Sequence, residues 1–113
     1  MSNHLVSIVI PAYNEVGIGR VLSDLAAKVR VPFEVLIVCD SDMDITFSAI
    51  RERSKPLIPH ILLVTSAGAG PRYAILSGIA ASRGEYVVVM MADSSDDAAT
   101  IDAMVAAADA GAD

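Results

Sequence analysis

The sequence Val6-Ser-Ile-Val-Ile-Pro-Ala-Tyr-Asn-Glu15 has the composition of a buried β-strand followed directly by a polar turn. Its apolar residues are mostly β-branched, as in a strand that is covered on both faces. Pro11 has no N–H to donate, so we expect the strand to end just before it. Tyr13, Asn14 and Glu15 then follow the carboxyl end of the strand, where ligands bind in open α/β sheets. The stretch therefore predicts a parallel sheet with a binding site at its carboxyl edge.

The rest of the chain alternates helical and strand-like patterns. Apolar residues at helical spacing predict helices over Val16–Val29, Ile45–Arg53, Tyr73–Ser82 and Thr100–Ala110. Short apolar runs predict strands over Val6–Ile10, Phe33–Cys39, His60–Val64 and Tyr86–Met91. Gly84 is suited to a left-handed cap after the third helix. This alternation is typical of right-handed βαβ units, and it predicts one domain, residues 1–113, built as an open three-layer α/β/α sandwich with a mainly parallel sheet.

Composition excludes several classes of protein. The chain has 113 residues, of which 54% are hydrophobic and none is Trp, so we expect an aliphatic core that includes Cys39, Met90 and Met91. A net charge of −6 argues against a nucleic-acid partner, which needs a basic face. The single cysteine excludes an intramolecular disulfide and fits a reducing compartment. No signal peptide or bilayer-spanning apolar run is visible, and we expect a cytoplasmic protein.

Polar and acidic residues follow three of the four predicted strands. These clusters are Asn14-Glu15, Asp40-Ser-Asp42-Met-Asp44 and Asp93-Ser-Ser-Asp-Asp97. Parallel strands bring their carboxyl ends to one edge of the sheet, where like charges repel one another. A cation, or a ligand rich in hydrogen-bond donors, would offset that repulsion.

Two of these clusters have both a structural and a functional interpretation. Asp93 is suited to bind Mg²⁺ or Mn²⁺ carrying a diphosphate, because these ions take oxygen ligands. Asp96 or Asp97 can cap the last helix, and we expect both roles to be present in that cluster. The cluster of Asp40, Asp42 and Asp44, taken alone, is more often an acidic turn with a helix cap. Its functional interpretation is recognition of a base or ribose by carboxylates.

The segment Gly68-Ala-Gly70-Pro-Arg72 invites comparison with phosphate-binding loops. It lacks the Lys-Ser/Thr pair of a Walker loop, and the G-x-G-x-x-G fingerprint is absent. Neither a P-loop NTPase nor a dinucleotide-binding domain is therefore supported. Arg72 is expected to lie near the predicted carboxylates or phosphates and to pair with them.

Taken together, these motifs resemble family 2 glycosyltransferases of the GT-A fold, whose nucleotide-binding half is Rossmann-like. The opening stretch resembles that family's first strand and nucleotide-binding turn. Val38-Cys-Asp-Ser-Asp-Met-Asp-Ile-Thr46 is similar to V-D-D-G-S-x-D-x-T, with Cys39 in place of the first acid. Gly70-Pro-Arg-Tyr-Ala74 with Gly78 resembles G-x-G-x-A-x-x-x-G. Ala81-Ser-Arg-Gly-Glu-Tyr86 resembles A-x-G-[DE]-Y, and Met91-Ala-Asp93 stands where the family has D-x-D.

The resemblance implies transfer of a sugar from a nucleoside-diphosphate donor, with inversion, to an acceptor. It is closest to the polyprenyl-phosphate branch, which includes dolichol-phosphate mannosyltransferase-like enzymes and has a lipid-phosphate acceptor at the membrane face. The implied metal ligand is Asp93, with Mg²⁺ or Mn²⁺ as the cofactor. The implied nucleotide-binding residues are Pro11, Ala12, Tyr13, Glu15, Asp40, Asp42, Asp44, Ala74 and Ala92.

Members of that family are longer, and their general base lies in the part beyond this sequence. We therefore expect a chain truncated at its C-terminus that binds the donor only, with any membrane association supplied by another part. An uncovered sheet edge would favour a homo-oligomer. The alternative is a non-catalytic nucleotide- or metal-binding module, or a receiver-like regulatory domain. A receiver needs a Lys at a later strand end, and no Lys follows Lys55.

Overall fold

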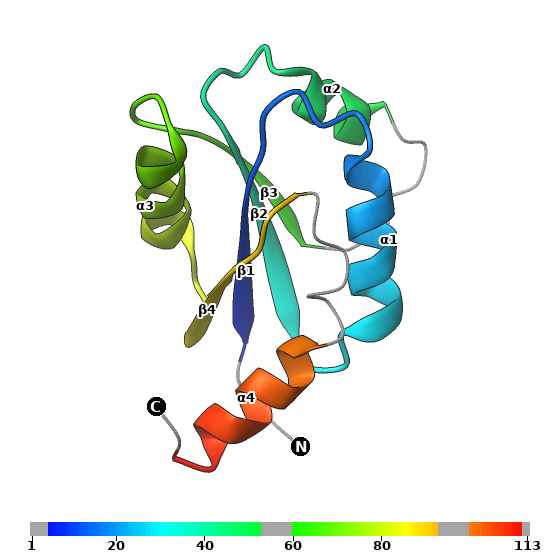
Figure 1. Ribbon diagram of the computed structural model, residues 1–113, viewed down its shortest axis with the longest axis vertical. Coiled ribbons are helices and arrows are strands. Elements are labelled where there is room, and N and C mark those ends of the chain that lie inside the picture. Colours follow the sequence, from blue (N-terminus) through cyan, green and yellow to red (C-terminus); the bar gives the residue numbers. More distant parts are fainter. Residues whose placement is uncertain (1–4, 53–59, 93–99, 112–113) are drawn as a thin grey trace.

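The computed structural model describes residues 5–52, 60–92 and 100–111. Strands and helices alternate through these ranges, as the sequence predicts (Figure 1). The strands are β1 (Val6–Pro11), β2 (Phe33–Cys39), β3 (Ile61–Thr65) and β4 (Tyr86–Val89). The helices are α1 (Ile18–Lys28), α2 (Ile45–Arg51), α3 (Pro71–Ala81) and α4 (Ile101–Asp109).

The strands form one parallel sheet in the order β3-β2-β1-β4. In this order the chain moves outward from β1 to β3 and then returns to place β4 on the other side of β1. The topological switch point of the sheet therefore lies between β1 and β4, where ligands bind in doubly wound folds. A receiver has a different order, in which the first and third strands are neighbours. The sheet thus excludes the receiver-like alternative and confirms the Rossmann-like one.

Helices cover both faces of the sheet, so the predicted three layers are confirmed (Figure 1). Side chains of α1, α2 and α4 form the larger core with alternate residues of β1 and β2, such as Ile8 and Ile37. On the other face Ala74 of α3 packs on Val9, Leu36 and Val38. The core is aliphatic except for Phe47, and Cys39 and Met90 are buried in it as expected.

Several predicted boundaries change. β1 includes Pro11, which is in register with Val38, and the N–H of Ala12 then donates to the carbonyl of Val38 at 2.9 Å. The expected break at Pro11 is wrong, because the missing N–H would face β4, and β4 has already ended at Val89. β4 is two residues shorter than predicted, and β3 begins and ends one residue later. The helices differ from their predicted ranges by one or two residues at most ends.

The proposed role of Gly84 as a left-handed cap is also wrong. Among the described residues only Gly70, Gly111 and Asn14 have positive φ. A Cβ atom at Gly84 would instead overlap the Ser7 hydroxyl and backbone, so the glycine permits a close approach between the start of β4 and β1. The predicted caps Asp96 and Asp97 lie outside the described residues.

Candidate functional site

A pocket of about 340 Å³ lies at the carboxyl edge of the sheet, at the switch point between β1 and β4. The turn after β1, the end of β2, the start of α3 and the segment after β4 contribute to it. Its lining residues are Pro11, Ala12, Tyr13, Glu15, Asp40, Gly70, Pro71, Ala74, Met91 and Ala92. Four segments that are distant in sequence therefore meet in one concave site, which is the usual geometry of a small-molecule pocket.

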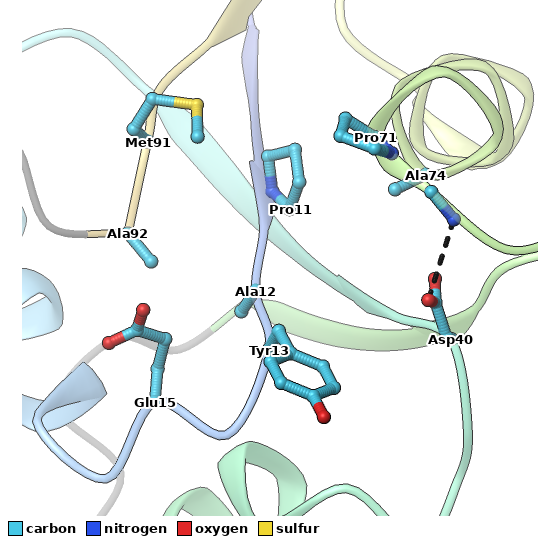
Figure 2. A pocket seen from close by; sticks show the side chains of 10 residues that line it. Pro11, Ala12, Tyr13, Glu15, Asp40, Pro71, Ala74, Met91 and Ala92 are labelled. Atoms are coloured by element: carbon cyan, nitrogen blue, oxygen red, sulfur yellow. Dashed lines mark hydrogen bonds between the residues drawn. The ribbon is translucent and has the colours of Figure 1, made fainter.

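The pocket has an apolar floor and two carboxylates on opposite sides (Figure 2). Glu15 lies on the side of Ala92, whereas Asp40 lies beside the start of α3. An Asp40 carboxylate oxygen accepts a long hydrogen bond of 3.4 Å from the N–H of Gly70. The ring of Tyr13 is 73% exposed at the mouth. Such a site is suited to a ligand with a flat apolar part and several hydrogen-bond donors.

Most of the predicted nucleotide-binding residues meet in this pocket. Seven of the nine line it, namely Pro11, Ala12, Tyr13, Glu15, Asp40, Ala74 and Ala92. Asp42 is exposed and Asp44 is buried, and neither lines the pocket. The predicted metal ligand Asp93 lies outside the described residues, directly after Ala92 in the chain.

Asp44 faces inward, and its carboxylate is occupied by backbone donors. Its Oδ1 accepts from the N–H groups of Thr46 at 2.8 Å and Asn14 at 3.0 Å, so it caps α2 and holds the turn after β1. Burial favours the neutral acid, but the hydrogen bonds from Thr46 and Asn14 outweigh it and lower the pKa of Asp44. The Asp44 carboxylate is therefore stabilised in its charged form by backbone N–H groups rather than by solvent.

Three pocket residues were missed by the sequence reasoning about nucleotide binding. Gly70 and Pro71 form the start of α3, and a Gly-Pro pair before a helical pattern is a start signal that could have placed them. Met91 was expected in the core, which is wrong, because it is 52% exposed and lines the pocket. Conversely, Arg72 is exposed and makes no ion pair with another described residue, so the expected pairing with Asp40, Asp42 or Asp44 is not present, whereas Asp93, Asp96 and Asp97 lie outside the described residues.

Cys39 lies beside this acidic turn but is shielded from the pocket. Burial and the nearby charge of Asp44 raise the pKa of the thiol to about 11. A thiol of this kind is neutral at physiological pH and is a poor nucleophile. Cys39 is therefore a core residue, as predicted.

The described part of the chain contains no group of three acidic, histidine or cysteine side chains placed to hold a metal ion. Glu15 and Asp40 are the carboxylates in the described pocket lining, and their oxygens are of the type that Mg²⁺ and Mn²⁺ prefer. None of the described helices has the length and apolar character needed to cross a membrane.

The sequence of this chain matches one family of enzymes. A family model described as glycosyl transferase family 2 matches residues 7–113. The undecaprenyl-phosphate 4-deoxy-4-formamido-L-arabinose transferase of Pseudomonas fluorescens (strain Pf0-1) is 28% identical over 115 residues, covering 97% of this chain and 34% of that protein. CsbB of Bacillus subtilis (strain 168), which carries the name of a glycosyltransferase, is 29% identical over 97 residues, covering 82% and 30%.

A solved structure has the same fold. The crystal structure of S. aureus TarS 1–349 in complex with UDP-GlcNAc matches with a TM-score of 0.55 and 27% identity, over 87% of this chain and 31% of that one. The present chain thus spans about a third of the length of the proteins it matches.

Proposed function

Because the chain belongs to glycosyltransferase family 2, we propose that its pocket binds a nucleoside-diphosphate sugar as the donor for sugar transfer. One observation carries this proposal. The segments that resemble the family's donor-binding motifs come from four distant parts of the chain, and they line a single pocket at the switch point of the sheet. The TarS structure, in complex with a nucleotide sugar, supports the same assignment.

The chemistry of the lining suggests how each part of the donor is held. Asp40 and Glu15 can accept hydrogen bonds from the ring N–H groups of a base and from ribose hydroxyls. The exposed ring of Tyr13 offers a face for stacking. The floor of the pocket is formed by small apolar side chains, those of Pro11, Ala12 and Ala74, which let a planar ring approach the edge of the sheet.

We also propose that Mg²⁺ or Mn²⁺ binds with the donor at Asp93. Family 2 enzymes of this fold typically use a divalent ion, which would supply charge neutralisation at the diphosphate. Ala92 lines the pocket, and Asp93 is the next residue. Met91 stands where the family's motif has its first acid, so the protein offers few oxygens. We therefore expect the ion to bind mainly together with the nucleotide.

A polyprenyl phosphate is the proposed acceptor, because one relative is named for undecaprenyl phosphate. Because such an acceptor is a lipid, transfer to it would take place at a membrane face. The pocket residues of the present chain all serve the donor in this scheme. We propose that acceptor binding and any general base belong to the remaining two thirds found in the relatives, so that this chain alone binds donor without transferring sugar.

The test is a thermal-shift screen of UDP-, GDP- and CDP-sugars with and without Mn²⁺. A ligand at a hundred times its Kd stabilises the native state by about 2.7 kcal/mol, which is readily seen as a rise in Tm. For the best nucleotide, Asp40→Asn should weaken binding about tenfold through loss of charge-assisted hydrogen bonds. Glu52→Gln, which removes an exposed acid at the far end of α2, is the matched control. Absence of any nucleotide-dependent shift would refute the proposal.

A further inference from the structure

The turn Tyr13–Glu15 carries two of the pocket residues, and its conformation is unusual. Asn14, at its centre, has φ of 50°, and it is the one non-glycine residue with positive φ within the described ranges. Such a conformation is strained for most side chains, although asparagine tolerates it better than others do. It persists only where neighbouring groups hold it in place. The groups that hold this turn therefore control how Tyr13 and Glu15 face the pocket.

Two side chains at the start of α2 hold the turn. The carboxylate of Asp44 accepts the N–H of Asn14 through both oxygens, at 3.0 and 3.2 Å. The hydroxyl of Thr46 accepts the N–H of Glu15 at 2.8 Å. Two successive amides of the turn are thus bound by residues thirty positions away, and Asp44 is itself fixed by the N–H of Thr46.

Neither of these side chains can easily touch a ligand. Thr46 is fully buried and Asp44 is 7% exposed, and neither lines the pocket. The lone pairs of Asp44 that point toward the turn are already used by backbone donors. Its place in the motif shared with the family would suggest a direct contact with the nucleotide, but its contacts are with the protein.

We propose that Asp44 and Thr46 are positioning residues, which hold Asn14 in its left-handed conformation and so present Tyr13 and Glu15 to the donor. This inference rests on the proposed function for the identity of the ligand, but not for the state of the turn. These hydrogen bonds connect the turn after β1 to the start of α2. Asp40 belongs to the short segment between β2 and α2, so it lies close in the sequence to the residues that hold the turn. Removing the acceptor at Asp44 or at Thr46 should lower donor affinity, although neither side chain contacts the donor.

The first measurement needs no ligand. Amide hydrogen exchange of Asn14 and Glu15, followed by NMR, reports opening of the turn, and core amides of β1 report global unfolding. Asp44→Ala should speed exchange at both turn amides by about tenfold or more, because it removes a charge-assisted hydrogen bond. Thr46→Val, which keeps the volume and removes the hydroxyl, should speed exchange mainly at Glu15. Glu34→Gln lies at the opposite edge of the sheet, and it serves as a control for general loss of stability.

The second measurement is the affinity of each variant for UDP-GlcNAc and GDP-mannose by calorimetry. Asp44→Ala and Thr46→Val should both weaken binding by about tenfold, and Asp44→Asn by less, because asparagine still accepts one amide and caps the helix. Glu34→Gln and Glu52→Gln should keep the affinity of the unaltered chain at temperatures where all variants are folded.

The two proposals fail in different ways. If the unaltered chain binds neither nucleotide nor any member of the thermal-shift screen, the donor site is refuted, and the exchange rates alone decide whether Asp44 holds the turn. If exchange at Asn14 is the same in Asp44→Ala as in the unaltered chain, the positioning role is refuted. It is also refuted if Asp44→Asn and Asp44→Ala lose affinity equally while Thr46→Val loses none, since Asp44 would then contact the donor itself.

Discussion

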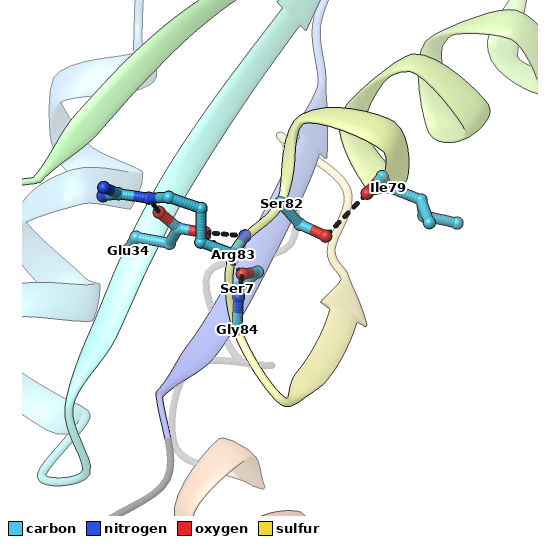
Figure 3. A network of polar contacts seen from close by, with 6 residues as sticks. All are labelled: Ser7, Glu34, Ile79, Ser82, Arg83 and Gly84. Carbon is cyan, nitrogen blue, oxygen red and sulfur yellow. Dashed lines mark hydrogen bonds and ion pairs between the residues drawn. The ribbon is translucent and has the colours of Figure 1, made fainter.

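The buried carboxylate of Glu34 connects several backbone segments by hydrogen bonds at the edge of the sheet opposite the pocket (Figure 3). It accepts hydrogen bonds from the Ser7 hydroxyl at 2.6 Å, the Arg83 N–H at 2.7 Å and Arg83 Nε at 3.1 Å. Ser7 in turn accepts the N–H of Gly84 at 2.7 Å. The network joins β1, β2 and the connection into β4, and no buried side-chain nitrogen or oxygen atom of the described residues lacks a hydrogen-bond partner. Burial alone would raise the pKa of Glu34, but these hydrogen bonds and the charge of Arg83 lower it.

We expect Glu34→Gln to lower the free energy of unfolding at pH 7 by about 2 kcal/mol, because the side-chain NH2 group of glutamine would face the donors of Ser7 or Arg83. The folded-state pKa lies below the ordinary value of 4.5, so the carboxylate stabilises the fold fully above that pH. Its contribution is lost as the pH falls further, through the lowered pKa. Urea unfolding of both proteins between pH 7 and pH 3 should show their stabilities converging, whereas Glu52→Gln should run parallel to the unaltered chain.

At the scale of elements, α3 packs unusually close to the sheet. Gly78 is the point of closest approach, and a Cβ atom there would clash with a methyl group of Val9 and crowd Val38. The same helix brings Pro71 and Ala74 into the pocket. Its distance from the sheet therefore sets the width of the pocket on that side.

Gly78→Ala should destabilise the protein by about 1–3 kcal/mol, even though alanine is the better helix former, because the clash is with buried strand residues that cannot move. Adding Val9→Ala should restore part of the loss by making room. Gly17→Ala is the matched control, since nothing lies within 4 Å of a Cβ atom at that position. Chemical denaturation measures all four proteins. A Gly78→Ala variant as stable as the Gly17→Ala variant would show that α3 can shift outward freely.

The whole molecule presents an apolar edge on the side of β4. β4 is the outermost strand of the described sheet next to β1, and Val87 and Val89 are 39% and 42% exposed. They are in register with Ser7 and Val9, and the helix on this face, α3, packs mainly on β1, β2 and β3. Such an edge, without charge or proline in the strand, favours association between copies of the chain.

We expect the chain to self-associate with rising concentration and Val89→Lys to shift it toward monomer, because a charged residue on the exposed face opposes strand-to-strand contact. Sedimentation equilibrium measures the change. Ser23→Lys adds the same charge at an exposed site on α1 and should leave association unaltered. A chain that remains monomeric throughout would show that this edge is already adequately protected.

Local periodicity was sufficient to predict the eight strands and helices in the described part of the chain, because strand and helix patterns depend on neighbours within a few residues. Polar residues after β1 and β2 also indicated where the pocket lies, since parallel strands place their carboxyl ends together. The strand order, the exposure of Met91 and the inward turn of Asp44 could not be obtained in this way. Each depends on how segments far apart in the sequence pack together, as when the Asn14 N–H donates to Asp44. An aspartate in an acidic turn has the same sequence signature whether its oxygens meet a ligand or the protein's own amides, and the folded chain alone distinguishes the two.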